Sequence, residues 1–266
     1  MFTTNPFSIL AETVPPIGLQ SFVIVMVAFV IIGTLVDIIH KKNVKYFFEN
    51  AKKAKLSATK TLSAGEKISV ISKTIVSDIA TTSELGAGKR RVAHLLGMYG
   101  TILFWTGSVI MIFCYSSPSS DTPSFWPIIW HVGAIMTVVG GSWFWLFLRV
   151  DVYSEAHPWY RIIKADLFVL ALIASSLFGL IWSCLQSLNL NDRWDDKAFL
   201  VLYIISNLAL FGGVYWSKFA HMFYKPGASI QKNLAEADGS RDNLPPPADA
   251  PEQYGLGIDR EKAKHY

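Results

Sequence analysis

The chain has 266 residues, of which 52% are hydrophobic and 17% are charged, and its formal net charge is +4. Soluble domains carry about 25% charged residues, so this composition excludes an ordinary soluble domain. Two cysteines are too few for a disulfide framework, a cysteine-bound zinc or an iron–sulfur cluster held by this chain alone. The sequence has no nucleotide-binding, zinc-protease or serine-hydrolase motif, and we expect no nucleic-acid partner.

Five apolar stretches are long enough to cross a bilayer as helices. They cover residues 17–39, 92–115, 127–148, 167–188 and 198–223, the last interrupted by Lys218. The first is not expected to be a cleaved signal peptide, because no basic residue precedes it and it exceeds the usual apolar region of about 7–15 residues. The sequence therefore predicts an all-α integral membrane five-helix bundle over 17–226, after a short segment at 1–16 and before a tail at 227–266.

The distribution of Lys and Arg predicts the orientation of this bundle. Residues 40–91 contain twelve basic and four acidic side chains, whereas residues 1–16 and 116–126 contain no Lys or Arg. Basic segments stay on the cytoplasmic side of a membrane. We therefore expect an N-out, C-in topology, with the basic connection 40–91 and the polar tail in the cytoplasm.

The connection and the tail each suggest a separate role. Ile68, Ile71, Ile75 and Ile79 recur at helical spacing and predict an amphipathic helix, which either lies on the membrane, docks a partner or packs beneath the bundle. The tail is polar, contains three consecutive prolines at 245–247 and shows no apolar period. This composition predicts an extended, flexible docking arm.

Two histidines are candidates for haem ligands. His94 opens the second predicted span and His221 lies near the end of the fifth. Because neighbouring helices run in opposite directions, both residues are expected at the same membrane depth, where two neutral imidazoles can ligate one haem iron. The alternative is that both are interfacial residues at helix ends.

The surroundings of the two histidines suit a macrocycle. Small residues alternate with a ring along the predicted face of His94, which continues through Gly97, Thr101, Phe104 and Gly107. Three cations are candidates for propionate contacts, because they flank the histidines at the predicted membrane surface. They are Arg90, Arg91 and Lys218.

These segments resemble a known family. Residues 89–100 read KRRVAHLLGMYG and residues 216–226 read WSKFAHMFYKP. They look like helices two and five of the five-span cytochrome b subunits, a group that includes the nitrate reductase gamma subunit and the membrane subunits of heterodisulfide reductase and of the quinone-interacting membrane-bound oxidoreductase complex. Within that group the chain most resembles the membrane anchors of dissimilatory adenylylsulfate reductase.

The resemblance implies a subunit of the inner membrane that passes electrons between a cytoplasmic flavin and iron–sulfur oxidoreductase and membrane quinone. It also implies that His94 and His221 ligate a haem b. Relatives with two haems carry a second histidine pair, which residues 100–104 and 203–207 lack here, so we expect a single haem. The iron–sulfur clusters must belong to the partner enzyme.

Other residues and functions complete the predictions. His131, in the third span after Trp126 and Trp130, is a candidate quinone contact or an ordinary interfacial histidine. Cys114 and Cys184 fall near the same predicted depth, and whether they pair is left open.

The alternative function is a haem-free anchor that only tethers the soluble enzyme. A transporter or channel is disfavoured, because no broken-helix pair or intramembrane charge chain is evident.

Overall fold

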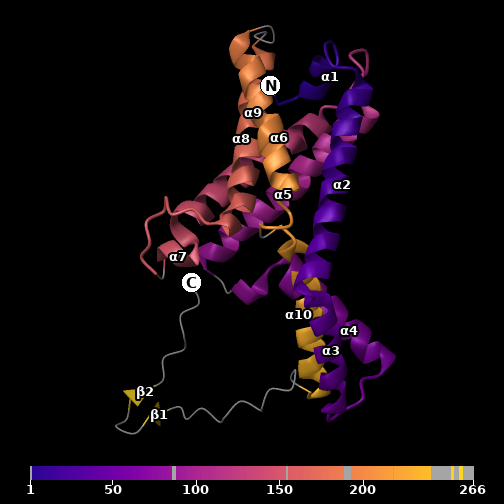
Figure 1. The fold of residues 1–266 in the computed structure, drawn as a ribbon, viewed down its shortest axis with the longest axis vertical. Helices are drawn as coiled ribbons and strands as arrows, with labels where there is room; N and C mark the ends of the chain where they lie inside the picture. Colours follow the sequence, from indigo (N-terminus) through magenta and orange to yellow (C-terminus); the bar gives the residue numbers. More distant parts are fainter. Residues whose placement is uncertain are drawn as a thin grey trace. The chain divides into compact units, whose positions relative to one another are not determined.

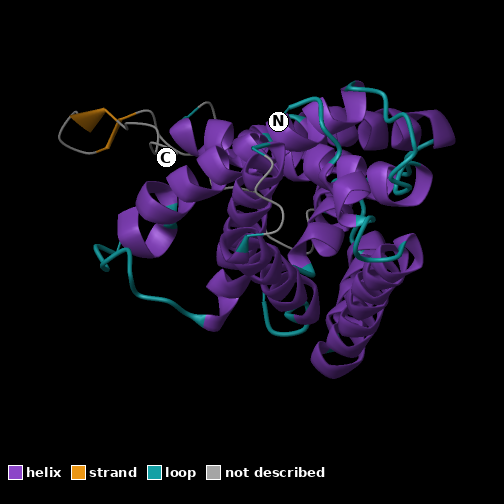
Figure 2. Cartoon of the chain, turned by 90° about the horizontal axis from the view of Figure 1, so that it is seen from above, coloured by secondary structure: helices purple, strands orange, loops and turns teal. Residues whose placement is uncertain are grey.

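The computed structural model describes residues 2–85, 88–153, 155–188, 193–217, 219–240, 253–254 and 258–259, with only the backbone described at residues 43, 150, 151, 221, 253, 254, 258 and 259. The chain divides into two compact units. The first unit contains Met1–Asp37 and Val92–Ala220, and the second contains Ile38–Arg91 and His221–Tyr266. Helices make up nearly all of the described structure (Figure 1, Figure 2), which confirms the all-α prediction.

The first unit is built from helices on either side of the inserted segment 38–91. They are α1 (Pro6–Leu10), α2 (Pro16–Lys41), α5 (Lys89–Cys114), α6 (Phe125–Trp143) with its π-helical continuation η3 (Phe144–Leu148), α7 (Val150–Tyr153), the 3-10 turn η4 (Lys164–Asp166), α8 (Leu167–Ser187) and α9 (Trp194–Gly212). α8 packs along α9 and also along α6, and Figure 1 shows α8 and α9 side by side.

Four helical segments are long and apolar enough to cross a membrane. They are Pro16–Lys41, Lys89–Cys114, Phe125–Leu148 and Lys164–Ser187. They correspond to the first four predicted stretches, so the prediction of several membrane-spanning helices is confirmed. The chain has the character of a multi-pass membrane protein.

The fifth predicted stretch is not one continuous helix. α9 ends at Gly212, residues 213–217 form a turn, and the next helix begins at His221. Two consecutive glycines weaken the helix at this point, and Leu167 packs where a Cβ on Gly213 would lie, at 2.9 Å. Residues 210–217 and His221 therefore do not share one continuous helical face.

One stripe of α2 contacts the rest of the first unit. Its members recur at alternating spacings of four and three residues, as in left-handed helix pairs. They are Leu19, Val23, Met26, Val30, Gly33 and Asp37. The other faces of α2 present large exposed apolar side chains, as a helix in contact with lipid requires.

Glycines bring α5 and α6 close together. A Cβ built on Gly133 would lie 2.5 Å from the backbone nitrogen of Phe104, and one on Gly140 would lie 2.6 Å from that of Gly97. Small residues at such contacts allow the two backbones to approach and pack through van der Waals contact. A side chain at Gly133 or Gly140 would therefore force the helices apart.

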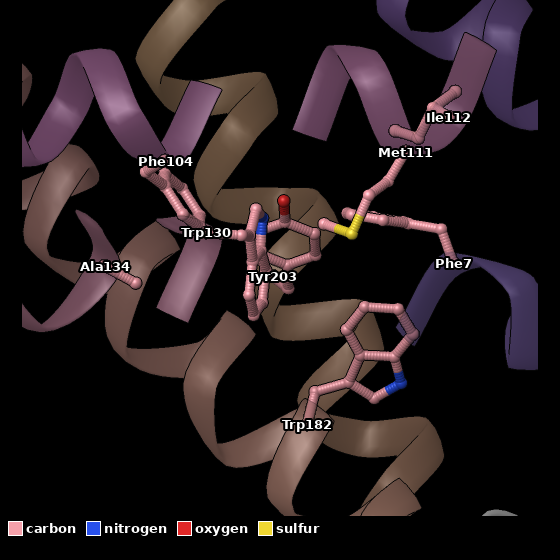
Figure 3. Packing of buried hydrophobic residues seen from close by; sticks show 8 residues of the cluster. All are labelled: Phe7, Phe104, Met111, Ile112, Trp130, Ala134, Trp182 and Tyr203. Carbon is pink, nitrogen blue, oxygen red and sulfur yellow. The ribbon is translucent and has the colours of Figure 1, made fainter. Parts of the chain in front are cut away.

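Aromatic side chains from five helices form the main core of the first unit (Figure 3). The rings of Trp130 and Trp182 are fully buried, and Phe7 of α1 packs against both, with ring centroids 5.9 and 5.8 Å away. Tyr203 of α9 stacks on Trp182 at 5.9 Å, and Phe104 of α5 lies 5.1 Å from Trp130. Such rings contribute large buried apolar areas.

The second unit consists of α3 (Asn43–Leu56), α4 (Ala64–Thr74), the π-helix η1 (Ile75–Ala80), the 3-10 turn η2 (Ser83–Leu85), α10 (His221–Asp238) and two antiparallel two-residue strands, β1 (Gln253–Tyr254) and β2 (Ile258–Asp259). A capping box between Ser63 and Glu66 begins α4. α10 packs on α3, α4 and η1 (Figure 1). The predicted amphipathic helix at 68–79 is present as α4 and η1.

The beginning of the predicted flexible tail is helical. Residues 227–238 belong to α10, which continues through Pro226. Asn233 on this helix donates hydrogen bonds to Asp78 and Thr74, and Lys225 pairs with Glu84. These contacts hold a polar segment that has no apolar period of its own. The prolines at 245–247 lie outside the described residues.

Candidate functional site

The two histidines predicted to ligate haem lie in different units of the structure. His94 lies on α5 in the first unit and is exposed, whereas His221 begins α10 in the second unit. The side chain of His221 and all of Lys218 lie outside the described residues. No distance between the two imidazoles is therefore defined.

The predicted haem-facing side of α5 is open only near His94. A Cβ on Gly97 would meet nothing within 4 Å, so space exists one turn along the helix. Further along, a Cβ on Gly107 would lie 2.9 Å from the Cβ of Trp130, and Phe104 is fully buried. A flat cofactor beside His94 would therefore lie next to Gly97, because Phe104 and Gly107 already pack against protein.

One of the cations predicted to contact propionates has a partner within the protein. Nε of Arg91 donates a hydrogen bond of 2.7 Å to the carbonyl oxygen of Thr81. This bond ties the start of α5 to the segment that follows η1. The other guanidinium nitrogens of Arg91 remain able to donate, so a propionate role for Arg90 and Arg91 stays a prediction.

His131 is buried between α6 and α8. Its Nδ1 lies 2.7 Å from the carbonyl oxygen of Pro127, and its Nε2 lies 2.8 Å from Oγ of Ser183. Because a carbonyl oxygen only accepts, Nδ1 carries the proton, and in the neutral ring Nε2 accepts from the Ser183 hydroxyl. Both nitrogens are engaged, so a quinone contact at His131 would require replacing the Ser183 hydrogen bond. Its ring also contacts those of Trp130 and Phe2.

An apolar pocket of about 720 Å³ lies in the first unit where α8 begins. Its walls are formed by Ile162, Ile163, Lys164, Leu167, Leu170, Tyr215 and Trp216. The Lys164 side chain is exposed, and no carboxylate in the part of the chain that the structure describes forms an ion pair with it. The pocket therefore combines apolar walls with one available cation.

Arg149 holds the loop that supplies one side of this pocket. Its guanidinium pairs with Asp166 at 3.0 Å and donates to the carbonyl oxygens of Trp159 and Arg161 at 2.7 and 2.8 Å. It also lies 3.7 Å above the ring of Trp145. Only a planar group with several fixed donors can make all four contacts. The sequence alone does not reveal this role of Arg149, because two of its partners are backbone carbonyl groups.

Asp78 is the polar centre of the second unit. Its carboxylate accepts hydrogen bonds from Ser77, Ser83 and Asn233 at 2.8, 2.7 and 2.7 Å. These bonds, led by that from Ser83, lower the pKa of Asp78 to about 2, although partial burial opposes the shift. Asp78 lies in the π-helical turn η1, a geometry that can re-aim side chains within a helix. It joins η1 to η2 and to α10.

The cysteines and the acidic residues offer no further site. Cys114 and Cys184 are both free thiols, so the open question of their pairing is answered in this structure. Among the described residues, no group of three His, Cys, Asp or Glu side chains is arranged to hold a metal ion. A bis-histidine haem would need only two such ligands.

Comparison of the chain with protein-family models, with curated proteins and with solved structures finds no match.

Proposed function

We propose that the chain is a membrane anchor and electron-transfer subunit, which links a cytoplasmic flavin and iron–sulfur oxidoreductase to the quinone pool of the inner membrane through one haem b. The observation that carries the proposal is His94, an exposed histidine at the start of a membrane-spanning helix, one turn from open space at Gly97. His94 and His221 would hold the iron through neutral nitrogens. The haem would supply one-electron transfer when bound.

The pocket beside Lys164 supports a quinone site. Its apolar walls suit an isoprenoid quinone, which needs little polar contact beyond its two carbonyl oxygens. The Lys164 ammonium can donate a hydrogen bond to one carbonyl and stabilise the negative charge that develops there during reduction. The Arg149 contacts fix the loop that carries Lys164.

The partner would provide the redox centres that this chain lacks. With two cysteines the chain holds no iron–sulfur cluster, so electrons must come from, or go to, a separate soluble enzyme. The resemblance of residues 89–100 and 216–226 favours adenylylsulfate reductase as that enzyme. Docking would use the second unit, whose connection 40–91 is strongly basic.

Two observations favour the alternative, a haem-free anchor that only tethers the enzyme. The residues expected to clear space for the macrocycle beyond Gly97 are packed, and the fifth stretch is broken before His221. Under this alternative the two histidines are surface residues. The membrane-spanning helices would then provide attachment without an electronic role.

A reduced-minus-oxidised absorption spectrum of the purified chain, supplied with haem during expression, separates the two functions. We expect a bis-histidine b-type signal that is lost in His94→Ala and in His221→Ala. His157→Ala is the matched control, because His157 is half-buried and lies outside the predicted site, and it should keep the signal. A folded protein without any haem signal would reject the electron-transfer function and leave the tether.

A second variant tests the space near His94. Gly97→Leu places a bulky side chain where a Cβ meets nothing within 4 Å, so the fold should tolerate it. If haem lies beside Gly97, this variant should lose haem while its thermal unfolding is unchanged. Retention of full haem content in Gly97→Leu would contradict that position.

A further inference from the structure

α3 begins directly after a membrane-spanning helix. α2 ends at Lys41 and α3 begins at Asn43, with Lys42 between them in the left-handed conformation at φ 53°. Two residues span at most about 7 Å. The first turn of α3 is therefore held by covalent connection close to the point at which α2 leaves the apolar part of the bilayer.

One face of α3 packs within the second unit. Val44, Phe47, Ala51 and Ala54 recur at spacings of three and four residues and are the less exposed positions of the helix, with Ala54 only 1% exposed. α3 packs on α10. Because this face is used inside the unit, only the exposed sides of the helix can meet another surface.

One exposed side of α3, which we call its outer face, combines cations with large apolar side chains. Lys45, Phe48, Lys52 and Lys55 recur at spacings of three and four residues and form one stripe, with Leu56 beside it. Phe48 is 64% exposed and Leu56 is 85% exposed. Large apolar side chains exposed next to lysines are typical of helices that lie at a lipid interface.

The charges of this face have few partners in the protein. Glu49 is the single acidic residue of α3 and lies 3.7 Å from Lys45. For Lys52 and Lys55, no ion pair with any described carboxylate is formed. Phosphate groups would complement these lysines, while acyl chains would cover the two apolar side chains.

We propose that this outer face of α3 binds anionic phospholipid in the leaflet from which α2 emerges. Phe48 and Leu56 enter the acyl region, and Lys45, Lys52 and Lys55 contact lipid phosphates. An acidic protein would also complement the lysines, but the covalent connection to α2 keeps the start of α3 near the membrane surface, which favours lipid. The role of α3 is independent of haem and of electron transfer.

The test uses the full chain in nanodiscs made of phosphatidylcholine alone or with added phosphatidylglycerol. In a Cys114→Ser, Cys184→Ser background, a fluorescent label on Phe48→Cys or on Leu56→Cys reports contact with spin-labelled lipid. We expect strong quenching of both labels only when the anionic lipid is present. A label on Asn50→Cys, which lies on the other side of the helix, should stay unquenched.

Charge variants provide the matched comparison. Each lysine near an anionic surface strengthens association about fivefold, so Lys45→Gln, Lys52→Gln and Lys55→Gln together should weaken the lipid-bound state on the order of 100-fold. The control removes three exposed lysines elsewhere in the second unit, Lys67, Lys73 and Lys232, and should keep the quenching.

Three outcomes would overturn the proposal. The first is equal exposure of the Phe48 label to aqueous iodide in both kinds of nanodisc. The second is an equal loss of quenching in the two triple variants, which would indicate a general charge effect. The third is protection of the label only when a soluble acidic protein is added, which would assign the face to a protein partner.

Discussion

Nε2 of His131 lies 2.8 Å from Oγ of Ser183, and both side chains are buried. This hydrogen bond joins α6 to α8. Water is absent from the apolar interior of a membrane, so a polar group there gains from any partner on a neighbouring helix. Together with the bond to the carbonyl oxygen of Pro127, the bond to Ser183 gives both ring nitrogens of His131 a partner within the protein.

Removing the Ser183 hydroxyl should destabilise the first unit. Ser183→Ala leaves Nε2 of His131 without its donor, and we expect a loss of about 1 kcal/mol in the free energy of unfolding. Unfolding of the purified protein in detergent micelles by a denaturant measures this loss. Ser187→Ala is the control, because the Ser187 hydroxyl bonds only to its own helix at the carbonyl of Ser183. If both variants were equally stable, the hydrogen bond between Ser183 and His131 would make no net contribution to stability.

The close approach of α5 and α6 should make Gly133 intolerant of any side chain. In Gly133→Ala the new Cβ would lie 2.5 Å from the backbone nitrogen of Phe104, so the helices must separate. Overpacking of this kind costs about 1–3 kcal/mol, which a lower melting temperature in micelles would report. Gly97→Ala on the opposite helix is the control and should melt as the parent does. A stable Gly133→Ala variant would mean that the helices do not touch there.

Replacing Arg149 by lysine should loosen the loop before α8. Lysine keeps the charge near Asp166 but cannot also reach the carbonyl groups of Trp159 and Arg161. We expect faster tryptic cleavage after Arg161 in Arg149→Lys, measured by mass spectrometry of timed digests. Arg193→Lys is the control, since Arg193 forms an exposed pair with Asp195. Identical cleavage rates in Arg149→Lys and the parent would contradict the role of Arg149.

Acid should release α10 from the rest of the second unit. Because the pKa of Asp78 is lowered to about 2 from an unfolded value near 3.9, its contribution is present above about pH 4 and is lost as the pH falls through about 2. The protection of the α10 amides, measured as hydrogen exchange relative to the intrinsic rate at each pH, should therefore fall over this range. Asp78→Asn should show the faster exchange already at neutral pH.

Glu66 provides the control for this acid transition. Its pKa is also lowered to about 2, chiefly by the hydrogen bond from Lys60, but it caps α4 and, among the described residues, forms no hydrogen bond or ion pair with α10. Glu66→Gln should leave exchange in α10 unchanged at neutral pH. If it accelerated exchange as much as Asp78→Asn, the effect would come from α4 and not from the contacts of Asp78.

Composition was sufficient to predict the first four spans, because a run of apolar residues has few alternatives to a membrane helix. The break after Gly212 was missed because hydropathy averages over a window and hides two glycines among apolar neighbours. The helix at 221–238 was missed because its stability comes from Asp78 and Glu84, which are far away in sequence. For the same reason the sequence did not reveal that His131 and Ser183 meet.

The contact stripe of α2 has a consequence for variation in this chain. Its six positions alternate by four and three residues and end at the buried Asp37. Deleting one residue of α2 before Asp37 would rotate all stripe residues that precede the deletion by about 100° relative to Asp37. Part of the stripe would then face lipid. Exchanges among Ile, Val, Leu and Phe on the outer faces preserve the stripe. Homologous chains should therefore vary in the identity of those outer residues, whereas the length of the helix should be constant.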